Sequence, residues 1–157
     1  MESSREETEA ERYDRNWSDL VQELRVAQTG VQVLAGFLLT LPFSARFEDL
    51  ADRHRTIYLV AFSLAVITVG LMTAPAALHR ILFGRHKKDV VVHAGDVFAK
   101  AGLAAMGLTL STVVLLIFGV VLGDTAGIIA GSVVLVFYVV VWVVLPISLL
   151  RRGAEPT

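Results

Sequence analysis

Two glutamines are the residues in this sequence whose type and spacing most strongly suggest chemistry. Gln28 and Gln32 lie four positions apart in an apolar stretch, so a helix would place them on one face, and Gly36 extends that face by another turn. Each amide offers two donor hydrogens and an acceptor oxygen, for which lipid has no partner, so the pair is expected to face protein. The two amides could line a polar pathway or bind a partner helix. Alternatively, they could hydrogen-bond to neighbouring helices and set the register of a bundle.

A set of basic residues forms the second candidate site. Their positive charge would suit anionic lipid headgroups, at about 1 kcal/mol for each basic residue near a membrane surface. The alternative is that these charges only orient the protein in the membrane. The set comprises Arg80, Arg85, Lys87, Lys88, Lys100, Arg151 and Arg152.

Catalytic, metal and cofactor sites are not expected. The chain has no Cys, which excludes disulfides, thiolate metal sites and thiol catalysis. His86 and His93 are too isolated to predict metal ligation, and the sequence has no nucleophile elbow, phosphate loop or Glu-x-x-His pattern. Nucleic acid is not an expected partner, because the basic residues adjoin apolar segments and no aromatic platform accompanies them. The sequence therefore predicts a protein that is not an enzyme and needs no cofactor.

The elements that must position these residues are four long apolar stretches. Hydrophobic residues make up 55% of the chain even without Gly, whereas soluble domains reach roughly 45–50% with Gly included. The stretches are 26–45, 56–79, 100–122 and 125–150. Lys100, at the start of the third, is their only charged residue, and about 20 helical residues cross a hydrocarbon core of about 30 Å. The expected fold is all-α, an integral membrane bundle of four transmembrane helices in a single membrane domain over 13–152.

The beginning of the chain differs in kind from the rest. Residues 1–12 are polar and acidic and are expected to form a disordered cytoplasmic tail, while 153–157 form a second, short tail. Between 13 and 25, apolar residues recur at steps of three and four, which predicts an amphipathic helix. This helix could lie near the headgroups with Trp17 as an anchor, or it could continue the first transmembrane helix into water. The sequence leaves both arrangements open.

The distribution of Lys and Arg predicts the orientation. With four spans both chain ends lie on one side of the membrane, and most of the 14 basic residues fall on that side. Because basic loops resist export, both termini are expected to be cytoplasmic and the protein to lie in the cell membrane. On the opposite side the turn Gly123-Asp124-Thr125 predicts an antiparallel hairpin, with Asp124 capping the fourth helix.

Small residues indicate where helices approach closely. Gly119, Gly123, Gly127 and Gly131 are spaced by four across this turn. Such rows allow close van der Waals contact between helices in lipid, either within one chain or between chains, and we favour contact within the chain. Pro75 lies inside the second stretch and is expected to bend the helix there.

These features favour an accessory or membrane-organising component that acts through helix and lipid contacts. Its partners would be the lipid bilayer, anionic lipid headgroups, and either a second copy of the chain or a partner membrane protein. The alternative is a small oligomeric transporter or cation/proton antiporter. An antiporter normally needs a titrating carboxylate within the bilayer, whereas all 15 Asp and Glu residues fall outside the four apolar stretches.

The segment WSDLVQELRVAQTGVQVLAGFLLTLPFSARF, residues 17–47, resembles a family of small bacterial membrane proteins classed as domain of unknown function 6328. The resemblance continues through 55–59, Ala74-Pro75 and His79-Arg80. It implies a four-helix membrane protein, and some members of that family carry an automatic sodium/proton antiporter label. The resemblance implies no catalytic or binding residues.

Overall fold

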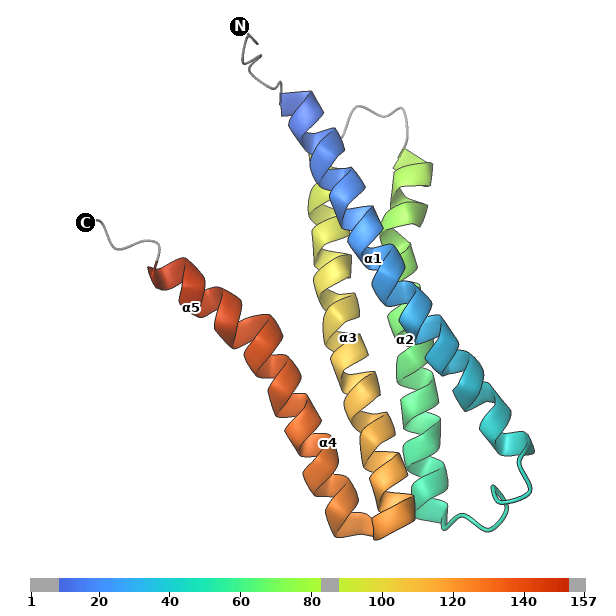
Figure 1. Cartoon of the computed structure of the whole chain (residues 1–157). Coiled ribbons are helices and arrows are strands. Elements are labelled where there is room, and N and C mark those ends of the chain that lie inside the picture. The colour runs from blue at the N-terminus through green and yellow to red at the C-terminus, as the bar shows by residue number, and fades with distance from the viewer. Residues whose placement is uncertain (1–8, 83–87, 153–157) are drawn as a thin grey trace, which may run out of the picture.

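The computed structural model of the chain describes residues 9–82 and 88–152, and all regular structure in these two ranges is helical (Figure 1). Three long helices are followed by a fourth that is interrupted by a wider turn. In chain order the elements are α1 (Glu9–Thr40), the 3-10 turn η1 (Leu41–Phe43), α2 (Asp52–Leu82), α3 (Lys88–Leu122), α4 (Asp124–Val139), the π-helical turn η2 (Val140–Val144) and α5 (Leu145–Arg152).

Four stretches of these helices are long and apolar enough to cross a membrane. They are Val21–Phe43, Asp52–Leu78, His93–Leu122 and Asp124–Arg151. In lipid a helix satisfies its own backbone hydrogen bonds, which is why apolar runs of this length become helices even where Val predominates. The predicted all-α fold with four transmembrane helices is confirmed.

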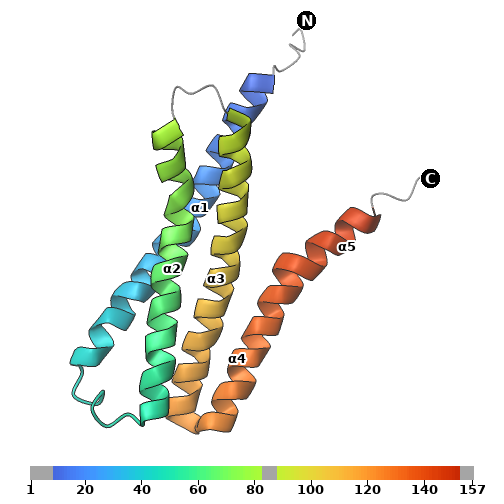
Figure 2. The same ribbon diagram turned by 180° about the vertical axis from the view of Figure 1, so that it is seen from behind.

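The helices form an open arrangement rather than a closed ring. α2 and α3 run side by side and antiparallel through the centre, and α1 crosses over both of them (Figure 1). α4 packs against α3 and leans away from the other helices, as the view from behind also shows (Figure 2). In the described part of the chain the backbone of α4 does not approach that of α1 or α2, although a side chain in its first turn reaches the start of α2. The ends of α1 and α5 nearest the two termini lie at the same end of the bundle (Figure 1).

Small side chains allow α3 to contact a helix on each of two faces. Toward α2, the α2 residues Ala61 and Ala65 are fully buried in a core cluster that includes Val113 and Leu116 of α3. Toward α4 the glycines are decisive, because a Cβ on Gly127 would lie 2.6 Å from the Leu115 carbonyl oxygen and 2.8 Å from the Cα of Gly119. Helix association in lipid depends on this kind of close packing. These glycines therefore make their contact within the chain.

α1 is one continuous helix. The segment 13–25 runs into the first apolar stretch without a break, so of the two arrangements that the sequence left open the structure has the continuous one. The predicted tail 1–12 is shorter than expected, because residues 9–12 already belong to α1. Glu and Ala in this segment are good helix formers, so an established helix extends into them. Residues 1–8 and 153–157, the other predicted tail residues, lie outside the described part of the chain.

The central helices extend beyond the predicted spans. α2 runs from Asp52 to Leu82 where 56–79 was expected, and α3 begins at Lys88 rather than at about Lys100. The prediction used the first charged residue as a boundary, which marks the edge of the hydrocarbon but does not end a helix. α2 also continues through Pro75, whose side chain is fully buried.

The last span is not the single helix expected over 125–150. Pro146 has no backbone N–H, and its ring crowds the carbonyl four residues earlier. The chain widens into η2 directly before this proline, where the Leu145 amide donates to the carbonyl of Val140. A π-helical turn relieves this conflict and lets the helix change direction. α5 accordingly leans further from α3 than α4 does (Figure 1).

Candidate functional site

α1 carries the two glutamines that the sequence singled out. Gln32 is exposed and Gln28 is half-buried. Leu24, Val31 and Leu38 form the inner face of the helix and are 6%, 1% and 3% exposed. Neither glutamine side chain makes a hydrogen bond in the part of the chain that the structure describes. Within the described residues the two amides therefore form no hydrogen bond between helices, and their expected contact with protein stays a prediction.

Gln32 belongs to a stripe of small and polar residues on α1, which we call the outer stripe. Its members are Thr29, Gln32, Gly36 and Thr40, all exposed. Steps of three and four place them on one side of the helix. The two threonine hydroxyls donate to carbonyls of their own helix, those of Arg25 and Phe37. No other residue lies within 4 Å of a Cβ built on Gly36. The amide of Gln32 is thus the polar group of the outer stripe that lacks a hydrogen-bond partner.

Among the described residues, three buried Ser and Thr hydroxyls lie inside the bundle. Thr68 and Thr109 face each other across the α2–α3 interface with their Oγ1 atoms 3.2 Å apart. Each also lies within hydrogen-bond distance of its own helix, Thr68 of the Leu64 carbonyl and Thr109 of the Ala105 carbonyl. Ser111 donates to the carbonyl of Gly107. The Thr68–Thr109 contact joins the two central helices, and no Asp, Glu, Lys or Arg side chain is buried among the described residues.

Tyr58 connects α2 to the end of α1. The side chain is buried, and its hydroxyl donates to the carbonyl of Leu38 at 2.9 Å. In a longer helix that carbonyl would accept from residue 42, but Pro42 has no N–H to donate. The tyrosine therefore supplies the donor that the end of α1 lacks.

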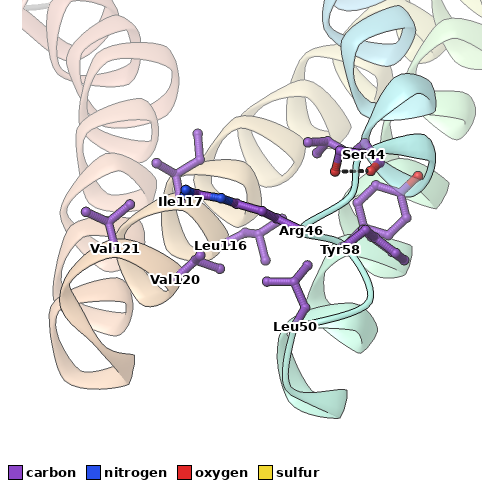
Figure 3. Close-up of a pocket in the computed structure, with 10 residues that line it drawn as sticks. Ser44, Arg46, Leu50, Tyr58, Leu116, Ile117, Val120 and Val121 are labelled. Carbon is purple, nitrogen blue, oxygen red and sulfur yellow. Dashed lines mark hydrogen bonds between the residues drawn. The ribbon is translucent and has the colours of Figure 1, made fainter.

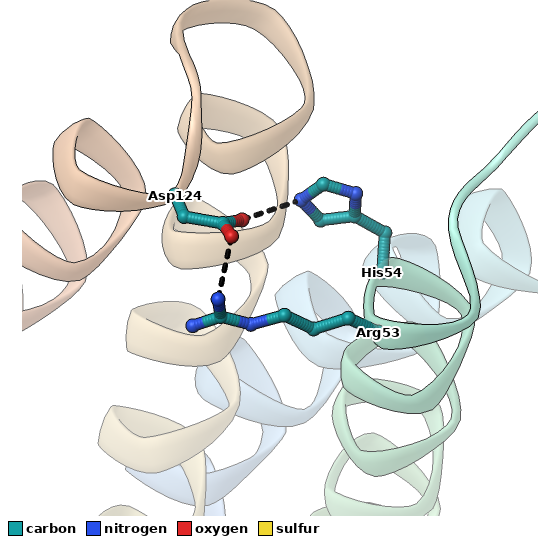
Figure 4. Close-up of polar contacts among 3 residues, drawn as sticks. All are labelled: Arg53, His54 and Asp124. Carbon is teal, nitrogen blue, oxygen red and sulfur yellow. Dashed lines mark hydrogen bonds and ion pairs between the residues drawn. The ribbon is translucent and has the colours of Figure 1, made fainter.

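A cluster of charges joins the starts of α2 and α4 (Figure 4), which lie at the end of the bundle opposite the termini (Figure 1). Asp124, in the first turn of α4, accepts from Arg53 at 2.5 Å and lies 3.1 Å from Nε2 of His54, both at the start of α2. The expected capping role of Asp124 is not observed. Gly123 is the N-cap residue, with φ of 94°, and no side chain caps α4. Asp124 instead points toward α2, where its negative charge also suits the positive end of the α4 dipole.

An apolar pocket lies beside this cluster, and we call it the connection pocket (Figure 3). It has a volume of about 250 Å³ and lies between the α1–α2 connection, α2 and the last turns of α3. Its walls include Leu50, Leu116, Val120 and Val121. Arg46 extends across it in the direction of α3 (Figure 3). In the described part of the chain the Arg46 side chain makes no hydrogen bond or ion pair.

The predicted lipid-binding basic residues are described in part. The side chains of Arg80, Lys100 and Arg151 are exposed, and they lie on α2, α3 and α5 toward the end of the bundle that carries the termini. Lys100 pairs with Asp96 one turn earlier, with 2.6 Å between Nζ and Oδ2. Arg85 and Lys87 lie outside the described residues, as do the side chains of Lys88 and Arg152. The structure thus brings the three described cations to one end of the bundle without joining them into one site.

Sequence reasoning missed three features: the Tyr58 bond, the partner of Asp124 and the pocket under Arg46. A signal for the first was present, because a proline at position 42 removes the donor for the Leu38 carbonyl. The other two depend on contacts between segments far apart in the chain, such as Arg53 with Asp124, and local patterns do not report these.

Comparison with known proteins places this four-helix chain in a family. Neither the curated proteins nor the solved structures give a significant match. The model of a family of unknown function, DUF6328, matches residues 6–146, a range that includes α1, α2, α3 and α4 and ends at the start of α5. Since this range is most of the chain, the protein belongs to the family of unknown function DUF6328.

Proposed function

We propose that this multi-pass membrane protein is a non-enzymatic component that organises the membrane, or assists a partner, through helix and lipid contacts. The observation that carries the proposal is the exposed, unbonded amide of Gln32 on a span that is apolar enough to lie in lipid. A polar amide facing hydrocarbon is unfavourable, and a neighbouring transmembrane helix can supply its hydrogen bonds. A contact with another transmembrane helix is therefore the simplest way to supply the hydrogen bonds that the Gln32 amide lacks.

Comparison with α4 shows why the outer stripe differs from an ordinary lipid-facing surface. Within the most apolar window of the last span no residue is buried, and the exposed side chains of α4 are largely Val, Ile, Leu and Phe. Lipid tails can cover such a surface without any loss. The outer stripe presents Gln32 beside Gly36, and small residues at an interface let two helix backbones approach closely.

The chemistry of the outer stripe favours a second copy of the chain as its binding partner. An amide donates and accepts, so the Gln32 side chains of two identical helices can hydrogen-bond to each other. Two copies related by a twofold axis would bring the same stripe together from both sides. Each interhelical hydrogen bond in a membrane contributes about 0.6 kcal/mol on average and up to about 1.7 kcal/mol.

The double variant Gln28→Ala/Gln32→Ala tests this proposal. Single-molecule photobleaching of labelled protein in liposomes counts the copies in each complex as the protein-to-lipid ratio changes. We expect dimers of the unmodified chain and about 3- to 20-fold weaker association of the variant. Val26→Ala/Val33→Ala, on exposed apolar positions of the same helix, is the matched control and should change association less. A monomeric unmodified chain, or equal association of all three proteins, would contradict the proposal.

For the cell we propose that the protein lies in the plasma membrane with both termini in the cytoplasm, where Arg80 and Arg151 would meet anionic headgroups. The excess of Lys and Arg on that side supports this orientation. Since the chain has no Cys, single cysteines report the topology cleanly. An impermeant maleimide added to intact cells should label Asp49→Cys and leave Glu155→Cys unlabelled. The reverse pattern would invert the orientation.

A small oligomeric transporter or cation/proton antiporter is the alternative function. In the described residues the buried polar side chains are hydroxyls, and Asp96 and Asp124, which lie near the ends of two spans, pair with Lys100 and Arg53. These observations support the first proposal, because ion exchange within a bilayer normally uses a titrating group there. Proton- or sodium-driven flux in proteoliposomes, abolished by Asp96→Asn, Asp124→Asn or Gln32→Ala, would favour the alternative instead.

A further inference from the structure

We propose that the connection pocket binds an amphiphile, with a segment of its acyl chain among the apolar side chains and its anionic group on Arg46. The site lies at the end of the bundle opposite the basic residues Arg80 and Arg151 (Figure 1). It also lies apart from the outer stripe. The proposal therefore stands independently of the proposed helix contact on α1.

The pocket is formed at the ends of membrane-spanning helices, so we expect it to lie where hydrocarbon gives way to headgroups. Leu116 and Val120 belong to the last turns of α3, which ends at Leu122. The ion pair between Arg53 and Asp124 lies directly beyond, at the level of the polar connections. A pocket at this depth is surrounded by the upper parts of acyl chains, and a cation at its edge lies near the phosphates or carboxylates of lipids.

The polar groups of the pocket leave one interaction unfilled. The Ser44 hydroxyl donates to the carbonyl of Leu41 at 2.7 Å, and the Tyr58 hydroxyl is bonded to α1. The guanidinium of Arg46 has no partner in the described part of the chain. Guanidinium groups bind phosphate and carboxylate through paired N–H donors. Apolar walls with one unpaired cation at the edge match a ligand with a hydrocarbon chain and an anionic head.

The pocket exists before any ligand arrives, because the connection that covers it is held in place. The Arg55 guanidinium donates to the carbonyl of Glu48 at 2.5 Å. The Phe47 ring packs edge-on against Tyr58 with 5.1 Å between ring centroids. A preformed site costs little ordering free energy on binding. Its volume of about 250 Å³ exceeds the roughly 150 Å³ of an apolar cavity that takes up benzene, so it can hold part of an acyl chain.

Photolabelling of the full-length chain in phosphatidylcholine liposomes tests the proposal. The probe is a trace of phosphatidylglycerol with a diazirine in its acyl chain, and mass spectrometry maps the labelled positions. We expect label on 41–50 and 116–121. Arg46→Gln should lower this labelling about tenfold, the loss of one charge-assisted interaction at its lower limit, while Arg46→Lys keeps part of it. Val120→Trp should block the pocket, whereas Val133→Trp on the exposed surface of α4 is the control and should change nothing.

Competition distinguishes the two sources of an acyl chain with an anionic head. Excess unlabelled phosphatidylglycerol and excess palmitate are added in separate samples, and the stronger competitor identifies a phosphate or a carboxylate ligand. Either result supports the site. The proposal is overturned if Arg46→Gln and Val120→Trp label as strongly as the unmodified chain. It is also overturned if a phosphatidylcholine probe labels the same residues equally well and independently of Arg46.

Discussion

Replacing Tyr58 with Phe removes one hydrogen bond and little else. The side chain is 4% exposed, and its ring packs against Phe47, so Phe preserves the packing while deleting the donor to the Leu38 carbonyl. Because Pro42 offers no N–H, that carbonyl is left without its usual partner. Interhelical hydrogen bonds in membranes average about 0.6 kcal/mol, and a buried acceptor left unpaired costs about 1–3 kcal/mol. We therefore expect Tyr58→Phe to lower the free energy of unfolding by about 1–2 kcal/mol.

Titration with sodium dodecyl sulfate in mixed micelles, followed by circular dichroism, measures this free energy. Tyr138→Phe is the matched control, because the Tyr138 hydroxyl makes no hydrogen bond in the described ranges of the chain. Its effect should stay within about 0.5 kcal/mol.

A second substitution separates the missing donor from any general effect of losing a hydroxyl. Pro42→Ala restores an amide N–H near the Leu38 carbonyl, so Tyr58→Phe should cost less in that background. Two results would refute the reasoning. One is an equal cost for Tyr58→Phe and Tyr138→Phe, and the other is a cost at Tyr58 that Pro42→Ala leaves unchanged.

Three further predictions concern helix packing and charge. Gly127→Ala places a Cβ 2.6 Å from the Leu115 carbonyl oxygen and should destabilise the α3–α4 contact by about 1–3 kcal/mol in the same unfolding assay, whereas Gly30→Ala, whose Cβ would meet no neighbour within 4 Å, should not. Thr109→Val removes one of the two facing hydroxyls and should lower the free energy of unfolding by about 0.6 kcal/mol. An unchanged free energy would show that the Thr109 hydroxyl bonds only to its own helix. Asp124→Asn should change stability by less than about 1 kcal/mol, because the ion pair is exposed, and 1 M salt should remove most of that difference.

The membrane spans could be predicted from the sequence because lipid leaves the chain few alternatives. An uncharged segment of this length can satisfy its backbone only as a helix, so even the Val-rich run after Ser132 forms helix. Helix ends were harder to predict, since a helix continues into water beyond the last apolar residue. Lys88 begins α3 for this reason, well before the boundary that the sequence predicted near Lys100.

The direction in which a face points could not be predicted from spacing alone. The interval between Gln28 and Gln32 correctly places them near each other on α1, but the inner face is fixed by Val31 and Leu38. The contacts that residues of the polar connections make also could not be predicted from the sequence. Asp124 has the sequence context of a cap, yet it pairs with Arg53 at the start of α2, a residue that only the folded arrangement brings near.

The wide turn η2 gives the last span a freedom that the other three do not have. Among the described helices α4 packs along α3 and is joined to α2 through Asp124 in its first turn, and α5 begins beyond a turn where the regular hydrogen bonding is already altered. A helix meets a thinner or thicker bilayer by changing its tilt, at a cost of fractions of a kcal/mol per Å of mismatch. In this chain we expect the adjustment to occur at η2, so that α5 follows the local thickness of the membrane while α1, α2 and α3 keep their packing.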